Sequence, residues 1–527
     1  MRIKQIEIKN YKSLEKLKVE VFNTLNVFIG KNDAGKSNVF SALDLLFNST
    51  ISTYTPVNTI KENILETVFQ TELSSQLYDK TNPVAEFTVN LSLSKKKRRQ
   101  WSLDATNDLA TLVFSKKLVI DKNKTKIFVD FIRLDKAIIV KTADEKNRFR
   151  TLDGKYVSKI EGTVAETILE CLQNEFILIP ANRIIYRDTQ VHSRKSEAGR
   201  YIERSLIELA NHKEDDKRNL YSQFKEFIKH LSPIVDTIEE KKKDGKIYDL
   251  MFKTSSGEEM PLVSIGGGNN ELLLLLHEII LGGGKILAIE EPEIHLHPEA
   301  ERKLYRFMKQ FSPATQIFIT THETVFVQPD NINALFRVVR KGAKTRVHTM
   351  TSKQYVDKNR LRQELNAENC EIFFADKVLL VEGISDKIMM DGLIDRYCES
   401  TNEIKVISSF SKDNFEVYID LLRIFKIPYL ILTDLDAVKG QRVIKPIWRE
   451  IKGVAGLKNK YDRIAYLKKK GIYVLSKGAL EQSYPRKYHR GISKPLDALY
   501  AIYELKDEEY YSETMKDLRE VIIALEK

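Results

Sequence analysis

Cysteine is scarce in this chain of 527 residues. The three cysteines, Cys171, Cys370 and Cys398, lie far apart in the sequence and form no close pair. This spacing excludes a zinc-binding cysteine motif and a disulfide framework. We therefore expect a protein of the reducing cytoplasm, whose fold depends on a hydrophobic core.

Long hydrophobic runs are also missing. The most apolar stretch, residues 272–281, is interrupted by His277 and Glu278. It is shorter than the roughly 20 residues that an α-helix needs to span a bilayer. No apolar signal core follows Met1. We therefore expect no membrane segment and no membrane partner.

The composition and charge favour a folded protein with a polyanionic partner. The hydrophobic fraction of 42% and the charged fraction of 30% are those of globular proteins. Lys and Arg outnumber Asp and Glu by 85 to 74, which gives a formal net charge of +11. Excess positive charge favours binding to nucleic acid. A basic soluble protein without such a partner has the same composition, so the charge alone leaves this alternative open.

The first 50 residues predict a strand, a loop and a helix in that order. Residues 3–11 alternate apolar and charged side chains, which predicts a half-buried strand. A second apolar strand is expected at residues 25–29. After a glycine loop, apolar side chains recur at helical spacing over residues 39–47. This order of elements is the context that a phosphate-binding loop requires.

The loop between that strand and helix matches the phosphate-loop motif G-x-x-x-x-G-K-[ST] at every fixed position. It reads Gly30-Lys-Asn32-Asp-Ala-Gly35-Lys36-Ser37. The glycines allow backbone N–H groups to curl around phosphate oxygens, and the helix that follows turns its positive N-terminus toward them. We expect Lys36 to reach the β- and γ-phosphates of ATP and Ser37 to bind Mg²⁺.

A second element of an ATPase lies near residue 290. The apolar strand 286–289 ends in two carboxylates, Glu290 and Glu291. We expect Glu290 to hold the hydration shell of Mg²⁺, although aspartate is commoner at this position, and Glu291 to orient and deprotonate the attacking water. The nearby His295-x-His297 pair suggests a zinc site, but directly after this strand we favour a role in shaping the loop.

Two further segments complete the pattern. The short strand 316–321 ends at His322, which we expect to hydrogen-bond the γ-phosphate; a simple loop histidine is the alternative. The segment from Ser264 to Asn269 contains Gly266 and two more glycines and precedes a helix. It looks like a degenerate signature loop, with which Ser264 and Gly266 would reach the nucleotide of a partner subunit.

Together these motifs resemble the ABC-type ATPase heads of RecF-like, SMC-like and OLD-family proteins. The resemblance covers residues 1–345 and rests on the phosphate loop, the serine–glycine loop, the Glu-Glu-Pro-Glu-Ile-His-Leu-His-Pro stretch and the Thr-Thr-His strand. In such heads the signature loop completes the site of the neighbouring subunit. The resemblance therefore implies ATP as cofactor and a homodimer or higher homo-oligomer.

The C-terminal third carries a different set of acids. One apolar strand ends in Glu382, with Asp386 in the following helical turn, and a later strand ends in Asp434 and Asp436. Side chains at i and i+2 of a strand end face the same side. The C-terminal ends of parallel strands line one crevice. These four carboxylates are therefore expected to converge on Mg²⁺, with Mn²⁺ as an alternative ion.

This acidic pattern resembles a TOPRIM domain, the module of topoisomerases, primases and OLD-family nucleases. The resemblance implies a further metal-binding glutamate at Glu481. It also implies a lysine that stabilises phosphate charge at Lys494, for which a surface lysine is the alternative. An ABC head followed by TOPRIM is the arrangement of OLD-family endonucleases, which include the nuclease subunit of Gabija-type defence and the effector of some retrons.

The expected fold class is α/β: an N-terminal ABC-type P-loop ATPase head with an inserted helical hairpin, then a Rossmann-like TOPRIM domain. The β-rich region 84–160 contains the basic run 95–99, which we interpret as a hairpin connection that is either solvated or in contact with DNA. The expected segments are the N-terminal lobe 1–190, the helical insert 191–245 (an arm for packing or dimerisation), the C-terminal lobe 246–345, a linker 346–370 and the TOPRIM domain 371–527.

The sequence favours an ATP-dependent DNA endonuclease or nickase in anti-phage defence. Its expected partners are DNA and a defence protein such as a helicase or a reverse transcriptase with its DNA product. Two alternatives stay open: a RecF-like or SMC-like repair ATPase that does not cut, and an ATP-gated sensor whose TOPRIM domain only binds a partner. The DNA site, the trigger and the direction of ATP control do not follow from the sequence.

Overall fold

The computed structural model divides the chain into two compact units. The first consists of residues 1–327 and 331–349, and the second of residues 328–330 and 350–527. The residues that the structure describes are 1–21, 23–48, 77–101, 103, 109–121, 124–135, 137–142, 149–151, 156–157, 164–173, 175–181, 196–231, 235–254, 256–261, 267–351, 353–354, 356–365, 368–410, 414–438, 449–452, 454, 457, 459–491 and 493–527.

The first unit contains an antiparallel sheet of eight strands, which confirms the β-rich region. Along β1 and β4, buried apolar side chains alternate with polar ones, because successive side chains of a strand point to opposite faces. In sheet order the strands are β2 (Leu14–Glu20), β1 (Arg2–Tyr11), β4 (Val84–Ser94), β5 (Leu109–Asp121), β6 (Lys124–Leu134), β7 (Ala137–Thr142), β8 (Phe149–Thr151) and β9 (Tyr156–Val157).

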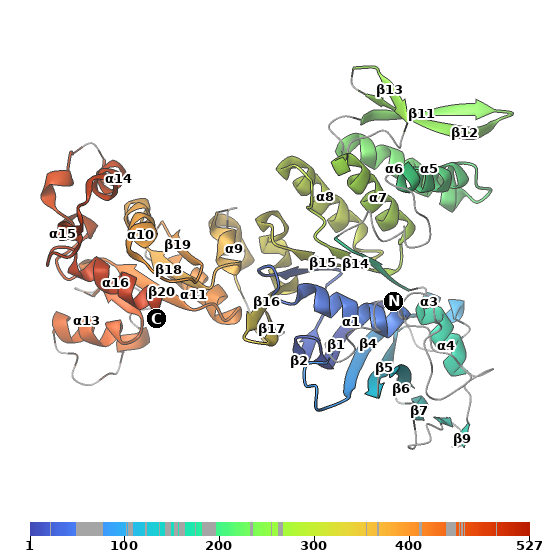
Figure 1. The fold of residues 1–527 in the computed structure, drawn as a ribbon, viewed down its shortest axis with the longest axis horizontal. Coiled ribbons are helices and arrows are strands. Elements are labelled where there is room, and N and C mark those ends of the chain that lie inside the picture. Colours follow the sequence, from blue (N-terminus) through green and yellow to red (C-terminus); the bar gives the residue numbers. More distant parts are fainter. Residues whose placement is uncertain are drawn as a thin grey trace. The chain divides into compact units, whose positions relative to one another are not determined.

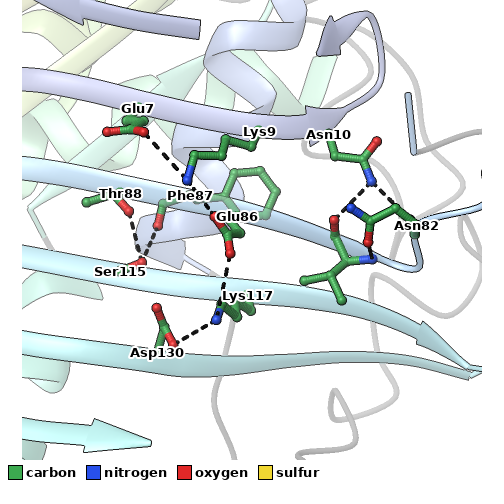
Figure 2. Close-up of polar contacts among 11 residues, drawn as sticks. Glu7, Lys9, Asn10, Asn82, Glu86, Phe87, Thr88, Ser115, Lys117 and Asp130 are labelled. Atoms are coloured by element: carbon green, nitrogen blue, oxygen red, sulfur yellow. Dashed lines mark hydrogen bonds and ion pairs between the residues drawn. The ribbon is translucent and has the colours of Figure 1, made fainter. Parts of the chain in front are cut away.

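One face of this sheet carries a row of alternating charges across four strands (Figure 2). Lys9 on β1 lies 2.8 Å from Glu86 on β4, and Lys117 on β5 lies 3.7 Å from Glu86 and 3.1 Å from Asp130 on β6. Opposite charges on neighbouring strands stabilise the pairing by roughly 0.2–1 kcal/mol each. The apolar residues of these strands fill the core on the other face.

The phosphate-loop strand lies inside a second sheet of the same unit, and Figure 1 labels four other strands of that sheet, β14 to β17. Helix α1 (Lys36–Asn48) joins the two sheets, because its apolar residues share one core with both. Five strands are parallel, and the edge strand β17 is antiparallel. The order is β10 (Phe176–Ile179), β14 (Ile286–Glu290), β15 (Gln316–Thr321), β3 (Leu25–Ile29), β16 (Leu335–Lys341) and β17 (Lys344–Thr349).

The basic run at residues 95–99 does lie in the connection between the antiparallel strands β4 and β5, but it is helical and not an irregular loop. Helix α3 (Lys95–Gln100) begins after Ser94, whose hydroxyl caps it by accepting the Lys97 N–H. Arg98 is buried, and the Lys97 ammonium lies 2.5 Å from the Glu175 carboxylate. These two cations therefore hold the ATPase unit together and do not line a solvated loop. Helix α4 (Val164–Gln173) follows later in the chain.

The helical hairpin that was expected as an insert at residues 191–245 is not confirmed. Helices α5 (Ser196–Ala210) and α6 (Asp215–Leu231) occur, but the chain continues as a β-hairpin of β11 (Val235–Lys243) and β12 (Lys246–Thr254), with β13 (Glu259–Pro261) beside it. Asp244 and Gly245 both have positive φ, of 51° and 77°. An Asp-Gly turn of this kind matches the twist of paired strands. Residue 245, where the helical insert was expected to end, therefore lies at the tip of a β-hairpin.

The two insert helices pack on the ATPase unit itself. The ring of Phe227 on α6 lies 4.2 Å from that of Phe307 on α8 (Pro298–Phe311). His277 on α7 (Gly267–Leu281) is hydrogen-bonded to Ser205 on α5 at 2.8 Å. Two short 3₁₀ helices follow β15, at η3 (Thr324–Phe326) and η4 (Pro329–Ala334).

The second unit is built on a parallel sheet of four strands. In order they are β19 (Ile404–Ser408), β18 (Lys377–Val381), β20 (Tyr429–Thr433) and β21 (Ile472–Val474). Its helices are α9 (Lys358–Glu364), α10 (Ile384–Tyr397), α11 (Phe415–Ile424), α13 (Lys460–Lys468), α14 (Lys494–Glu504), α15 (Asp507–Tyr510) and α16 (Lys516–Glu526), with 3₁₀ turns η5 (Asn369–Phe373), η7 (Leu435–Val438), η8 (Leu480–Gln482) and η9 (Arg486–Tyr488). In the part of the chain that the structure describes, no helix has both the length and the apolar character to cross a bilayer.

Candidate nucleotide site and candidate metal centre

The phosphate loop has a shape that only glycine permits at two positions. Gly30 has φ of 150° and Gly35 has φ of 98°, a region that residues with a Cβ rarely adopt. A Cβ at Gly30 would lie 2.2 Å from the carbonyl oxygen of Val338, and one at Gly35 would lie 2.2 Å from the hydroxyl of Thr345. Both glycines of the motif are therefore required by packing as well as by phosphate binding.

Lys36 is buried inside this loop. Its ammonium donates hydrogen bonds to the carbonyl oxygens of Gly30, at 2.7 Å, and Lys31, at 3.0 Å. Burial lowers the pKa of Lys36, and the negative charges of Glu291 and Glu293 act in the opposite direction. The lysine therefore lies in a dry pocket next to the end of β14, where a phosphate would be a stronger partner than a carbonyl group.

The two carboxylates of the second motif stand at the C-terminal end of β14. Both side chains are half-buried. Glu290 accepts the N–H of Ala181 at 3.4 Å, and Glu291 has a positive φ of 42° while its N–H is bonded to Thr320 at 2.9 Å. A non-glycine residue in this conformation is uncommon and turns the side chain out of line with the strand. The two carboxylates therefore diverge from one strand end beside Lys36.

His322 follows the next strand, β15, which pairs with β14. Its Nδ1 lies 3.4 Å from a carboxylate oxygen of the buried Glu293, and its Nε2 lies 3.5 Å from Glu323. The ring is about half exposed, at 43%. The parallel pairing of β14 and β15 thus brings Glu290, Glu291 and His322 to one edge of the sheet.

The histidine pair after β14 has structural contacts. His295 Nδ1 lies 3.0 Å from both oxygens of the buried Glu271. The His297 side chain caps α8 by accepting the Glu299 N–H. Among the described residues neither belongs to a cluster with the geometry of a metal site. These contacts support the interpretation that the pair shapes the loop.

The remaining residues proposed for ATP lie at the surface or outside the description. Asn32 and Ser37 are exposed at the start of α1, where Ser37 is open to an incoming metal ion. Ser264 and Gly266 of the expected signature loop lie outside the described residues. How this signature loop would reach the nucleotide of a neighbouring subunit therefore stays a prediction.

Sequence reasoning missed Lys12. It lies in the turn between β1 and β2, with φ of 48°, and its largely buried ammonium donates to Ser41 on α1 at 3.0 Å. Burial lowers the pKa of Lys12, and the charge of Glu290 raises it. A second cation thus stands beside the phosphate-loop helix, about 20 residues before the motif, and no spacing rule points to it.

Three of the predicted acids in the second unit come together. Glu382, Asp434 and Asp436 each place one carboxylate oxygen within 4.8 Å of the others. Glu382 follows β18 and Asp434 follows β20, and these strands are parallel neighbours. Glu382 is fixed by the Thr433 hydroxyl and by the N–H of Asp434 at 2.9 Å. The cluster is therefore organised by the ends of two adjacent strands.

Asp386 lies next to this cluster and caps α10. Its Oδ2 accepts the N–H of Gly383 at 2.9 Å. Burial, with smaller contributions from the charges of Glu382 and Glu481, raises its pKa to about 6. Asp386 thus lies beside the acids, but one of its oxygens is hydrogen-bonded to the backbone. It does not belong to the cluster of Glu382, Asp434 and Asp436.

Glu481 and Lys494 form an ion pair near the same acids. The ammonium of Lys494 lies 2.8 Å from Glu481, and this hydrogen bond is the main cause of a raised lysine pKa. Asp434 and Asp386 also raise the pKa of Lys494 through their charges. The side chain of Lys494 is 71% exposed, so it projects from the rim of the acidic cluster.

The donor set fits a hard divalent cation. Carboxylate oxygens are the ligands that Mg²⁺ and Mn²⁺ prefer. Glu382, Asp434 and Asp436 supply three of them on one side, and the neighbouring Asp386 and Glu481 are also carboxylates. Three acids at this distance repel one another unless a cation or a proton offsets their charge.

These arrangements define a P-loop ATPase unit followed by a parallel α/β unit with an acidic centre. Residues 1–327 match the AAA ATPase domain family, and residues 373–436 match the TOPRIM domain of overcoming lysogenization defect protein-like proteins. The first match spans more than half of the chain, so this protein belongs to the AAA ATPase domain family. It joins that ATPase domain to an OLD-like TOPRIM domain.

Several curated proteins with similar sequences are nucleases, and an ATP/GTP phosphatase of Helicobacter pylori is 22% identical over 62% of this chain and 86% of that protein. The chain is 31% identical to an OLD nuclease of Thermus scotoductus over 161 residues, which are 28% of this chain and 30% of that protein. It is 24% identical to Endonuclease GajA of Bacillus cereus strain HuB5-5 over 266 residues, or 44% and 36% of the two chains. The chain thus spans about a third of these two relatives. With GajA of strain VD045 it shares 23% identity over 84% of this chain and 76% of that one.

Proposed function

We propose that this protein binds and hydrolyses ATP and is a divalent-metal-dependent DNA endonuclease or nickase. The observation that carries the proposal is the cluster of Glu382, Asp434 and Asp436, whose oxygens lie within 4.8 Å of one another at the ends of two parallel strands. Three carboxylates in this arrangement suit a divalent cation that activates water for phosphodiester hydrolysis. The similarity to OLD and GajA nucleases supports the same conclusion.

In the ATPase unit we assign each group one task. Backbone N–H groups of the loop from Gly30 to Gly35 hold the phosphates, and Lys36 gives up its two carbonyl contacts to bind them. Ser37 and Glu290 hold Mg²⁺, and Glu291 orients and deprotonates the attacking water.

In the TOPRIM unit Glu382, Asp434 and Asp436 hold Mg²⁺ or Mn²⁺, with Asp386 and Glu481 as additional ligands. Bound there, the cation supplies an activated water and charge stabilisation for the departing oxygen of a phosphodiester. Lys494 leaves Glu481 to pair with a phosphate oxygen of the scissile strand. Since a surface ion pair of this kind contributes at most about 1 kcal/mol, exchanging one anion for another costs little.

A basic segment next to Lys494 supports DNA as the substrate. No acid occurs between residues 482 and 496, whereas the side chains of Arg486, Lys487 and Arg490 are exposed. The backbone is held in place by the buried Tyr488, whose hydroxyl donates to Glu504 O at 2.9 Å. Cations on a fixed frame beside a metal centre suit the phosphate backbone of a nucleic acid.

We further propose that the protein acts in anti-phage defence as a homodimer or higher oligomer in the cytoplasm. Its partner would be a helicase or a reverse transcriptase with its DNA product. The similarity to GajA nucleases over most of the chain motivates this role. Light scattering with and without ATP tests the assembly, and a monomer under both conditions contradicts it.

A plasmid assay tests the activity. Supercoiled DNA is incubated with the full chain and Mg²⁺ or Mn²⁺ across a series of ATP concentrations. We expect nicked or linear product that disappears with a chelator, and the ATP series reveals whether the nucleotide activates or restrains cutting. Intact plasmid under every condition, combined with steady ATP hydrolysis, would favour a clamp or a sensor.

A further inference from the structure

Glu293 is buried in the ATPase unit, two residues after Glu291, and has no role in the proposed function so far. It is only 4% exposed. A carboxylate in such a place is costly unless it is hydrogen-bonded, because it loses its hydration. No described residue donates a hydrogen bond to its Oε2. Its contacts therefore depend on the other oxygen alone.

The contacts of that oxygen with other residues lie at the end of β15. Oε1 accepts the hydroxyl of Thr321 at 2.6 Å and the backbone N–H of His322 at 3.1 Å. The same oxygen lies 3.4 Å from Nδ1 of the His322 ring. Thr321 is fully buried, so the anchor is rigid while the ring itself is half exposed. One side of the ring thus lies within ion-pair distance of a buried carboxylate, and the ring is partly exposed to solvent.

We propose that Glu293 is a positioning residue for ATP hydrolysis, which fixes the orientation and the protonated nitrogen of His322. This inference rests on the proposed ATPase function. With the Nδ1 proton facing Glu293, the negative charge of the carboxylate favours a second proton on Nε2, which a hydrogen bond to a γ-phosphate oxygen requires. A carboxylate behind a histidine fixes its tautomer and ring angle in the same way in metal sites and in catalytic triads.

Neighbouring charges do not provide this contact. Glu323 faces Nε2 from the other side at 3.5 Å and is 40% exposed, so it is open to solvent screening. Glu301 on α8 acts on His322 only through its charge. The charge of Glu293 also raises the pKa of Lys36, against the larger effect of burial, so the same carboxylate acts on the phosphate lysine as well.

The variant Glu293→Gln separates positioning from a structural role. A glutamine oxygen still accepts the Thr321 hydroxyl and the His322 N–H, but it lacks the charge that attracts a proton on Nδ1. We expect kcat for ATP to fall about 10- to 100-fold, the range typical when a metal-binding histidine loses the carboxylate that orients it. KM and the affinity for a non-hydrolysable ATP analogue should change less than twofold. Glu301→Gln removes a charge from the same cluster and should leave kcat within twofold.

The double variant shows whether Glu293 acts through the histidine. In a His322→Ala background, Glu293→Gln should have no further effect on kcat, because coupled residues are not additive. Independent, multiplying losses would overturn the proposal, as would wild-type turnover in Glu293→Gln.

A spectroscopic readout does not depend on turnover. In protein labelled with ¹⁵N-histidine, the Nδ1 resonance of His322, assigned by its loss in His322→Ala, should move in Glu293→Gln and not in Glu301→Gln. If the wild type proves inactive on ATP, the proposed function fails while this measurement still decides the positioning. An unchanged resonance would contradict the inference in an active enzyme.

Discussion

Among single residues, Lys36 has the strongest predicted effect on the nucleotide site. Lys36→Ala should abolish ATP binding or hydrolysis, because the variant lacks the charge that clamps the β- and γ-phosphates. Glu291→Gln keeps the clamp and should bind ATP but hydrolyse it at least about 100-fold more slowly, in line with the loss of a general base. Equilibrium binding of a fluorescent ATP analogue and phosphate release measure the two effects. Wild-type turnover in Lys36→Ala would remove the phosphate-loop assignment, and fast turnover in Glu291→Gln would move the base elsewhere.

Gly35 offers a second test at this scale, with a matched glycine as control. Gly35→Ala should abolish ATP binding, because its Cβ meets the Thr345 and Ser13 hydroxyls at 2.2 and 2.8 Å in addition to the cost of φ at 98°. Gly284 has φ of 81° but nothing within 4 Å of an added Cβ. Gly284→Ala should therefore lose only about 1–2 kcal/mol of stability and bind ATP normally. Equal effects in thermal unfolding and ATP titration would show that packing at Gly35 is unimportant.

Residues of the site could be predicted from the sequence when they belong to one short motif. Lys36 lies six residues from Gly30 in a pattern with fixed chemistry, and Glu382 and Asp434 each end an apolar strand. Lys12 and Thr345 were not predicted, because their roles arise from contacts that the chain closes only on folding. Thr345 is hydrogen-bonded to the Ala34 carbonyl over a separation of 311 residues, which no local pattern encodes.

At the scale of elements, the bulge in β5 buries a lysine beneath the phosphate-loop helix. The register of β5 and β6 shifts between Ser115 and Lys116, and both residues are buried as a result. Burial lowers the pKa of Lys116 to about 7, while the charge of Asp44 on α1 acts in the opposite direction. Burial also raises the pKa of Asp44, which faces this ammonium.

This burial makes stability depend on pH. Between about pH 7 and pH 10.5 the unfolded chain binds more protons at Lys116 than the folded chain does, so the unfolding free energy rises with pH. The slope from one proton is at most about 1.4 kcal/mol per pH unit. Lys116→Met should flatten this rise between pH 7.5 and 9.5, as measured by urea unfolding.

The adjacent residue provides the control. Lys117 on β5 is partly exposed and paired with Glu86 and Asp130 (Figure 2). Lys117→Met should keep the rise that Lys116 produces. If both variants retain the same slope as the wild type, the alkaline dependence has another source and Lys116 is not buried as a neutral amine.

The elements themselves could be predicted where periodicity was strong. The strand at 25–29 was expected with the bounds that the structure gives, and the strand at 286–289 extends by one residue to Glu290. The hairpin of β11 and β12 was missed because its many lysines and glutamates obscure the alternation, although Asp244-Gly245 is a strong turn signal. Helix α3 was missed because a run of cations was interpreted by its charge instead of by Ser94, which begins the helix.

For the whole molecule, the main consequence of the two-unit organisation is that the two chemistries should separate. The candidate nucleotide groups belong to the unit that ends at residue 349, and the acidic cluster belongs to the unit that continues to Lys527. Each unit has its own sheet and its own core. A substitution in one site therefore does not remove a ligand from the other.

Asp434→Ala should eliminate DNA cleavage, by at least about 100-fold, and leave ATP hydrolysis within about twofold of wild type. Loss of one carboxylate weakens the metal centre, because the acids together must offset the hydration that the cation gives up. It also removes one of the negative charges that raise the pKa of Lys494, although Glu481 is the acid paired with this lysine. The nucleotide site keeps Ser37 and Glu290, so the substitution removes none of the groups assigned to ATP hydrolysis. The control variant Glu508→Ala replaces an exposed acid of the same unit and should cut plasmid like the wild type. If Asp434→Ala nicks supercoiled plasmid at the wild-type rate over a Mg²⁺ and Mn²⁺ series, the TOPRIM unit is not the nuclease, and a clamp or sensor function becomes the better explanation.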